Sequence, residues 1–278
     1  MALDGRLSEL EGLVRNEEEM EGLQVHEEAA AAKVEVAIVG GGLAGLAVLV
    51  ALQQRGIKAH LYEKYPGLRS DTATAIGIGS NGVTALEGIQ SGLSKIISAL
   101  GVHSKVLKVD TAINENEVSS RCTEWPDASY ITVNWKLVQQ ALAKLVCEEY
   151  IHCSHELLFY KQMEDGLVDA YFDVKEEESS NSLRNMKVIH TQMLIGADGI
   201  WSAVRRQMVN DEARYLHMVD WNAIVYDPHE KLFENVGRGE IYLYTDLERS
   251  MNYLLANAGE LYDQTFVTFA FFLARVHR

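Results

Sequence analysis

The sequence is poor in basic residues and has no long apolar run. Lys and Arg number 25 against 40 Asp and Glu in 278 residues, which gives a formal net charge of -15. Because nucleic-acid phosphates bind clustered Lys and Arg, this balance argues against a nucleic-acid partner. No stretch approaches the roughly 20 apolar residues of a membrane span, so none is expected. The acidic N-terminus lacks the basic region and apolar core of a signal peptide, and a cytoplasmic protein is the prediction.

Cysteine is also scarce. Cys122, Cys147 and Cys153 form an odd, sparse set, which makes no disulfide framework and is typical of a reducing compartment. His152 and His155 lie near these cysteines, but their spacing fits no common zinc pattern, and neighbouring residues on a strand alternate between its faces. No metal site is therefore predicted.

Three regions of the chain differ in composition. Residues 1–32 form an acidic leader, in which leucines at helical spacing continue into a Glu run without a cap, and this favours a frayed helix or disorder. Residues 33–210 alternate strand-like and helix-like runs, which predicts an α/β domain. Residues 211–278 hold short strand-like pieces at 223–226, 240–244 and 266–273, which predicts the start of a β-rich region.

The α/β domain opens with one complete βαβ unit. The β-branched run Val34–Val39 is typical of a buried parallel strand. After a glycine-rich turn, Leu43–Arg55 is apolar nearly all round and predicts a buried helix, with Gly56 as its C-terminal stop. Lys58–Tyr62 predicts the second strand, which ends at Glu63.

Further elements are predicted downstream. Ser80 or Asn81 is expected to be the N-cap of a helix rather than part of a hairpin turn, because apolar residues follow at helical spacing. Other helices are expected over 93–100, over 135–149 and from Ser202. Two strand-like runs flank Asp165-Gly166, which predicts a hairpin, and Met193–Gly196 predicts another strand.

The turn Gly40-Gly41-Gly42-Leu43-Ala44-Gly45 has the spacing of a dinucleotide-binding loop. Gly40 allows the tight turn, Gly42 lets the backbone approach a pyrophosphate, and Gly45 permits close packing of helix on strand. Leu43 and Ala44 begin the helix, whose N-terminus offers N–H groups and a positive dipole end to phosphates. The alternative is a turn that serves packing alone.

An acidic residue completes this pattern. Glu63 follows the turn by about 20 residues at a strand end, with Lys64 beside it, and a carboxylate there can accept hydrogen bonds from ribose hydroxyls. A glutamate rather than a basic residue favours FAD or NAD over NADP. The turn by itself does not separate FAD from NAD.

A second motif makes that separation. The string Leu194-Ile195-Gly196-Ala197-Asp198-Gly199-Ile200-Trp201-Ser202-Ala203-Val204-Arg205-Arg206 resembles the second fingerprint of the FAD-dependent aromatic-hydroxylase monooxygenases, the relatives of para-hydroxybenzoate hydroxylase and zeaxanthin epoxidase. Ala75-Ile76-Gly77-Ile78, followed by Asn81 and Leu86, is a partial second match. Arg69 occupies the region where relatives place a basic residue near the flavin. The alternative for the string is a strand–helix turn in which Asp198 only caps the helix.

The resemblance implies an α/β, Rossmann-like FAD-binding domain of the glutathione-reductase type, with an inserted or following β-rich substrate region. It implies that Asp198 and Gly199 lie close to FAD, in a loop also used for the nicotinamide cofactor. Ser202 and Arg205 are expected to brace that turn. Trp221, Tyr242 and Tyr244 are candidates to line the substrate region.

Two departures from the family pattern stand out. Where relatives have an Arg near the start of a helix, this sequence has Trp135, which makes no bidentate contact with phosphate, and Lys136 is the nearest substitute. The family's third fingerprint, a late Gly-Asp pair that opens a helix beside the flavin, does not occur. The sequence is therefore expected to be a truncated or alternatively spliced member, with the adenosine end of the site present and the flavin end incomplete.

The function predicted by resemblance is an FAD-dependent monooxygenase. It would use NAD(P)H and O2 to oxygenate an apolar or aromatic small molecule, and no catalytic residue is assigned. Two alternatives stay open, namely another FAD- or NAD-binding oxidoreductase and a nucleotide-binding fragment without turnover.

Overall fold

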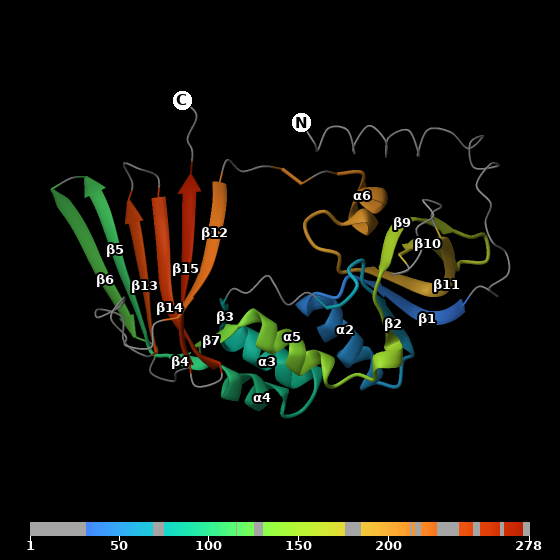
Figure 1. Ribbon diagram of the computed structural model, residues 1–278, viewed down its shortest axis with the longest axis horizontal. Helices are drawn as coiled ribbons and strands as arrows, with labels where there is room; N and C mark the ends of the chain where they lie inside the picture. Colours follow the sequence, from blue (N-terminus) through green and yellow to red (C-terminus); the bar gives the residue numbers. More distant parts are fainter. Residues whose placement is uncertain are drawn as a thin grey trace.

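The computed structural model describes residues 32–68, 75–114, 116–124, 130–175, 185–211, 213–214, 218–226, 239–246, 251–261 and 264–274. Three sheets and five α-helices organise these residues, with one six-stranded sheet at each end of the molecule and most of the helices between them (Figure 1). The elements in chain order are β1 (Ala32–Val39), α2 (Leu43–Gln53), β2 (Ala59–Tyr62), β3 (Ala75–Ile78), α3 (Ser80–Ile89), α4 (Leu93–Leu100), β4 (Val102–Ser104), β5 (Val106–Asn114), β6 (Glu117–Glu124), β7 (Tyr130–Asn134), α5 (Trp135–Ala143), the short 3-10 helix η2 (Glu148–Tyr150), β8 (Ile151–His152), β9 (His155–Gln162), β10 (Val168–Val174), β11 (Asn185–Gly196), α6 (Ala203–Val209), β12 (Met218–Tyr226), β13 (Glu240–Asp246), β14 (Met251–Leu261) and β15 (Gln264–Ala274).

The first six-stranded sheet has the order β8-β2-β1-β11-β10-β9. Strands β8, β2, β1 and β11 run parallel, whereas β10 and β9 are antiparallel to their neighbours. Strand β1 is buried on both faces, as its β-branched run predicts: Val36 and Ile38 belong to one apolar cluster and Ala37 and Val39 to the other. The first cluster packs α2, α4 and α5 against the sheet, and the second packs against α6.

Helix α2 connects β1 to β2 and is the centre of the larger apolar cluster. Leu46, Leu49 and Val50 are fully buried on it. The helix ends with the predicted glycine stop: Gly56 has φ +75°, and the Ile57 N–H donates to the Leu52 carbonyl at 3.1 Å. The βαβ unit expected from the sequence is confirmed.

Several boundaries differ from the prediction. Helix α3 starts at Ser80 with Gly79 as its N-cap, so neither Ser80 nor Asn81 caps it. Helix α5 ends at Ala143 rather than 149, because the next residues tighten into a turn and bury Val146 in the core, which leads the chain into β8. Strand β11 begins at Asn185, eight residues before the predicted start, because its first half pairs with β10.

The second six-stranded sheet has the order β12-β15-β14-β13-β5-β6. It takes β5 and β6 from residues 106–124 and its other strands from beyond residue 217, so it joins chain from both sides of the predicted boundary at 210. Strands at 223–226, 240–244 and 266–273 were expected and are present within β12, β13 and β15, whereas β5, β6 and β14 were not predicted. The side chains of Lys108 and Glu240 form an ion pair at 2.7 Å across β5 and β13.

A small sheet of order β3-β7-β4 lies beside the helices and carries the chain into α5. The Asn134 side chain caps α5 by accepting from the Lys136 N–H at 2.9 Å. Among the helices of the described residues, none combines the length and the apolar character that a membrane span requires.

Candidate functional site

Three parallel strands end at one edge of the first sheet, and two loops meet there. The Gly40 N–H donates to the Tyr62 carbonyl at 2.8 Å, which ties the end of β1 to the end of β2. The Ala197 N–H donates to the Val39 carbonyl at 2.8 Å, which ties the loop after β11 to β1. The carboxyl edge of a parallel sheet is where such folds bind ligands.

The glycine turn is closely packed on every side except one. A Cβ atom on Gly40, which has φ +107°, would lie 2.4 Å from the Ala197 carbonyl oxygen, and one on Gly45 would lie 2.0 Å from the Gly40 oxygen. A Cβ on Gly41 would lie 2.7 Å from Leu68 Cδ2. In contrast, a Cβ on Gly42 would meet no heavy atom within 4 Å. The turn therefore leaves open space at Gly42, the residue that precedes the first turn of α2.

Helix α2 presents its N-terminus to this open space. Gly42 is its N-cap, and no side chain caps the helix. The first N–H groups of a helix have no partner within the helix and carry its positive dipole end. An anionic group beside Gly42 would therefore meet backbone donors and a favourable field.

Glu63 lies directly beside the turn and is bonded to it. Glu63 is 8% exposed. Its Oε2 accepts from the Gly41 N–H at 2.5 Å and its Oε1 from the Tyr65 N–H at 3.0 Å. Because a carboxylate has about four acceptor positions, each oxygen keeps one for a further donor. Lys64 is exposed and its Nζ lies 5.2 Å from the Tyr65 ring centroid.

Gln139 on α5 also contacts the turn, and sequence reasoning missed it. Its side chain is buried, and its Nε2 donates to the Gly41 carbonyl at 2.9 Å. The two residues are 98 positions apart in the chain. A glutamine on the buried face of a helix is the one available signal, since buried amides need a hydrogen-bond partner.

Asp198 lies next to the glycine turn but directs its carboxylate into α6. Its Oδ1 accepts from the Ser202 hydroxyl at 2.5 Å and its Oδ2 from the Ala203 N–H at 2.7 Å. A Cβ on Gly40 would lie 2.9 Å from the Asp198 Cα, so the two backbones touch. Gly199 has φ +80°, a left-handed conformation that glycine adopts without strain. Asp198 thus serves as a helix cap while its loop lines the same edge.

The remaining predicted site residues are distributed differently. Ser202 braces the turn as expected, because its hydroxyl donates to Asp198, and its Oγ also caps α6 by accepting from the Arg205 N–H at 2.9 Å. The Arg205 guanidinium points to an exposed ion pair with Asp211 at 3.0 Å, so it does not brace the turn. Arg69 and the Trp221 side chain lie outside the described residues. The Tyr242 hydroxyl donates to Asp110 Oδ2 at 2.8 Å.

A cluster of histidines lies behind Glu63. The Glu63 N–H donates to the His152 carbonyl and the His155 N–H to the Glu63 carbonyl, both at 2.8 Å. The His152 ring stacks on Tyr62, and its Nε2 is 2.9 Å from His60 Nδ1. Burial lowers the pKa of His152 to about 4, with further lowering by the neighbouring histidines.

The other two histidines are shifted in the same direction. Burial lowers the pKa values of His60 and His155. The rings therefore pack as neutral groups at neutral pH. Within the described ranges, no group of three His, Cys, Asp or Glu side chains is placed to hold a metal ion.

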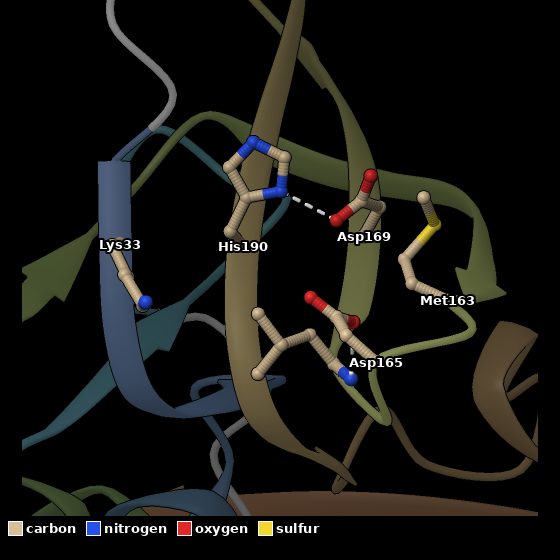
Figure 2. Close-up of a pocket in the computed structure, with 6 residues that line it drawn as sticks. Lys33, Met163, Asp165, Asp169 and His190 are labelled. Atoms are coloured by element: carbon tan, nitrogen blue, oxygen red, sulfur yellow. Dashed lines mark hydrogen bonds and ion pairs between the residues drawn. The ribbon is translucent and has the colours of Figure 1, made fainter.

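A separate hollow of about 320 Å³ lies at the opposite end of β1. Figure 2 shows Lys33, Asp169 and His190 around it, with His190 Nδ1 bonded to the Asp169 carboxylate. Lys33 is near the N-terminal end of β1, and the eight residues of that strand span about 25 Å to the glycine turn. This hollow is therefore no part of the site at the carboxyl edge.

A glycine turn between a parallel strand and a helix, with an acid at the end of the next strand, defines a dinucleotide-binding protein. Residues 33–263 match the family described as FAD binding domain, and the chain belongs to this family. The dinucleotide is therefore FAD, and the predicted resemblance to FAD-dependent aromatic hydroxylases is confirmed.

Relatives of this chain include a monooxygenase and an epoxidase. The 3-amino-4-hydroxybenzoate 2-monooxygenase of Streptomyces cremeus is 28% identical over 187 residues, which are 66% of this chain and 44% of that protein. The chloroplastic zeaxanthin epoxidase of Spinacia oleracea is 27% identical over 186 residues, which are 63% of this chain and 26% of that protein. The chain thus spans less than half the length of these two relatives.

A solved structure shows the same mixed α/β fold. The 2,6-dihydroxypyridine-3-hydroxylase from Arthrobacter nicotinovorans superposes with a TM-score of 0.68 at 18% identity, over 90% of this chain and 58% of that one. At this identity the likeness shows the fold alone.

The residues present fit the adenosine and pyrophosphate part of FAD. The open side at Gly42 accommodates a group that a Cβ would otherwise displace, and the uncapped N-terminus of α2 faces the same space. Glu63 keeps acceptor positions for ribose hydroxyls beside it.

Proposed function

We propose that this chain is the dinucleotide-binding part of an FAD-dependent monooxygenase, which uses NAD(P)H and O2 to oxygenate an apolar or aromatic small molecule. The observation that carries the proposal is the glycine turn: an added Cβ at Gly40, Gly41 or Gly45 would lie 2.0–2.7 Å from its nearest neighbouring atom, whereas one at Gly42 would meet none within 4 Å. The relatives named above support the reaction class.

The proposed roles follow from where each side chain lies. The turn from Gly40 to Gly45 would hold the pyrophosphate on backbone N–H groups, and Glu63 would accept from a ribose hydroxyl. By resemblance, the loop of Asp198 and Gly199 would lie along the cofactor, with Lys64, Arg69 and Arg205 nearby. When bound, FAD supplies the redox and oxygen chemistry, while the protein positions it and excludes water.

The same proposal covers the organisation of the chain. Residues 33–210 would form a Rossmann-like FAD-binding domain of the glutathione-reductase type, and the second six-stranded sheet would belong to a substrate region. Strands β5 and β6 lie within residues 33–210 in the chain but belong to this sheet. Strand β5 pairs with β13 and β6 pairs with β5, which supports a substrate region that is partly inserted in the first domain. A cytoplasmic location is also proposed, supported by three cysteines that are all free.

The visible spectrum of the purified chain tests cofactor binding. We expect a yellow protein with a flavin spectrum, or a colourless protein that acquires this spectrum when FAD is added and unbound FAD is removed. A protein that stays colourless after this loading would refute the assignment of the site.

Oxygen consumption tests the activity separately. NADH or NADPH is added in air to the FAD-loaded chain, with free FAD at the same concentration as the control. Faster oxygen uptake or peroxide release than in the control supports the monooxygenase reading. FAD-loaded protein that consumes oxygen no faster than free FAD would restrict the proposal to FAD binding.

A further inference from the structure

We infer that Gln139 is a positioning residue for FAD. It holds the Gly41–Gly42 peptide so that the Gly42 N–H faces the pyrophosphate. The inference rests on the proposed function, because it deepens the role of the glycine turn. It assigns a role to a helix α5 side chain that the dinucleotide motif does not include.

The Gly41 peptide units are fixed from two sides. The Gly41 N–H donates to Glu63 at 2.5 Å, and the Gly41 carbonyl accepts from Gln139 at 2.9 Å. A carbonyl only accepts, so the amide of Gln139 presents its NH2 group to it. Gln139 is 3% exposed, and a bond at this depth is shielded from competing water.

The orientation of the next N–H follows from peptide geometry. In a trans peptide the carbonyl and the following N–H point in opposite directions, and the described residues contain no cis peptide bond. Because Gln139 draws the Gly41 carbonyl towards α5, the Gly42 N–H points away from α5. The Cβ position of Gly42 has no heavy atom within 4 Å, and an N–H that points away from α5 would face this open space.

The residue types make this restraint necessary. Both Gly41 and Gly42 lack a Cβ, so their shared peptide has more rotational freedom than one between other residues. If Gln139 released the carbonyl, a rotated peptide would turn an oxygen rather than an N–H towards the phosphates. Anion binding would then lose a donor and gain a repulsive acceptor.

Two variants of Gln139 separate this role from general packing. Gln139→Met keeps the length of the side chain and removes the donor. Gln139→Glu keeps the shape, has no donor when ionised and regains an O–H donor when protonated. The matched controls are Gln140→Met and Gln140→Glu, because Gln140 is the exposed neighbour on the same helix.

The dissociation constant of FAD is measured by flavin fluorescence on titration with apoprotein at pH 8 and pH 6, and folding is checked by circular dichroism. We expect Gln139→Met to weaken FAD about tenfold at both pH values, which corresponds to about 1.4 kcal/mol. Both Gln140 variants should stay within twofold of the wild type. Gln139→Glu should bind FAD more weakly than the wild type where its carboxyl is ionised and should recover as the pH falls, relative to the wild type at each pH.

The outcomes distinguish this inference from the proposed function. A wild-type chain that does not bind FAD overturns the proposed function and the inference together. If the wild type binds FAD and Gln139→Met binds it within twofold, only the inference is overturned. If Gln139→Met does not fold, Gln139→Leu, which also removes the donor, replaces it, and FAD binding within twofold of the wild type by that folded variant overturns a role for the donor.

Discussion

Substitution of Gly42 or Gly45 by alanine adds the same methyl group in two different surroundings. At Gly42 the methyl group would enter the open space proposed for the cofactor, and at Gly45 it would clash with the protein backbone. A Cβ on Gly45 would lie 2.0 Å from the Gly40 oxygen, whereas ordinary contacts begin at 3.4 Å, so the two groups would have to separate by about 1.4 Å. A Cβ on Gly42 would meet nothing within 4 Å, and its φ of -73° suits any residue. The same substitution should therefore have opposite consequences at the two positions.

For Gly45→Ala we expect a loss of stability with or without FAD. Overpacking costs about 1–3 kcal/mol, and the upper end applies because the clash is with backbone atoms of Gly40 and not with a flexible side chain. For a chain of this size, about 3 kcal/mol lowers the Tm by roughly 6–12 °C. Thermal unfolding of the apoprotein measures this effect, and a Tm within about 3 °C of the wild type would contradict the close packing of helix on turn.

For Gly42→Ala we expect an unchanged fold and weaker FAD binding. The chain-entropy gain of about 0.4–1 kcal/mol and the loss of a better N-cap nearly cancel, so the apoprotein Tm should move by less than about 3 °C. FAD should bind about tenfold more weakly, which corresponds to about 1.4 kcal/mol. Gly42→Val should weaken it about a hundredfold, since its methyl groups extend farther. If Gly42→Val keeps FAD with a dissociation constant within threefold of the wild type, the pyrophosphate does not lie at this turn.

Three further changes test other parts of the site. Asp198→Ala removes the acceptor of the Ser202 hydroxyl and of the first N–H groups of α6, while the N-cap Ser202 remains. Urea unfolding should show a loss of about 1–2 kcal/mol, and a loss below about 0.5 would contradict a stabilising role of these bonds. Arg205→Ala removes an exposed pair with Asp211, so the same assay should show a change of less than about 0.5 kcal/mol. The pKa of His152 is lowered to about 4 in the folded state. As the pH falls below about 6.5, this histidine is therefore protonated in the unfolded chain before it is in the folded one. Its contribution to stability is complete above about pH 6.5 and is lost towards pH 4. Because the ring is half-buried, we expect about 1–2 kcal/mol less stability at pH 5 than at pH 7, a difference that should shrink in His152→Gln.

The first βαβ unit could be predicted because its signals are local. The β-branched run of β1, the glycine spacing and the stop at Gly56 each restrict the backbone within a few residues. The motif around Asp198 could be recognised for the same reason, since Asp198, Ser202 and the first N–H groups of α6 lie within six residues of one another.

The missed strands have a different cause. Strand β6 is exposed along its whole length and forms the edge of its sheet, so it shows no alternation of apolar and polar residues. Strand β14 includes Asn, Gly and Glu, which are depleted in strands, and it is held between β13 and β15. Pairing with partners far along the chain overrides such weak local preferences.

Glu63 shows how a sequence rule can have two physical origins. An acid about 20 residues after a glycine turn is expected to bind a ribose, yet here its Oε2 already accepts from the Gly41 N–H and its Oε1 from the Tyr65 N–H. The carboxylate therefore shapes the turn before any ligand arrives, as Gln139 does from the other side of the same residue. The separation between Glu63 and the glycine turn can be recognised in the sequence, because β2 lies beside β1 and ends at the same edge of the sheet. The spacing of Gln139 carries no such signal, because any helix that crosses the turn could supply the donor. The turn is thus specified partly by residues whose positions only the fold reveals.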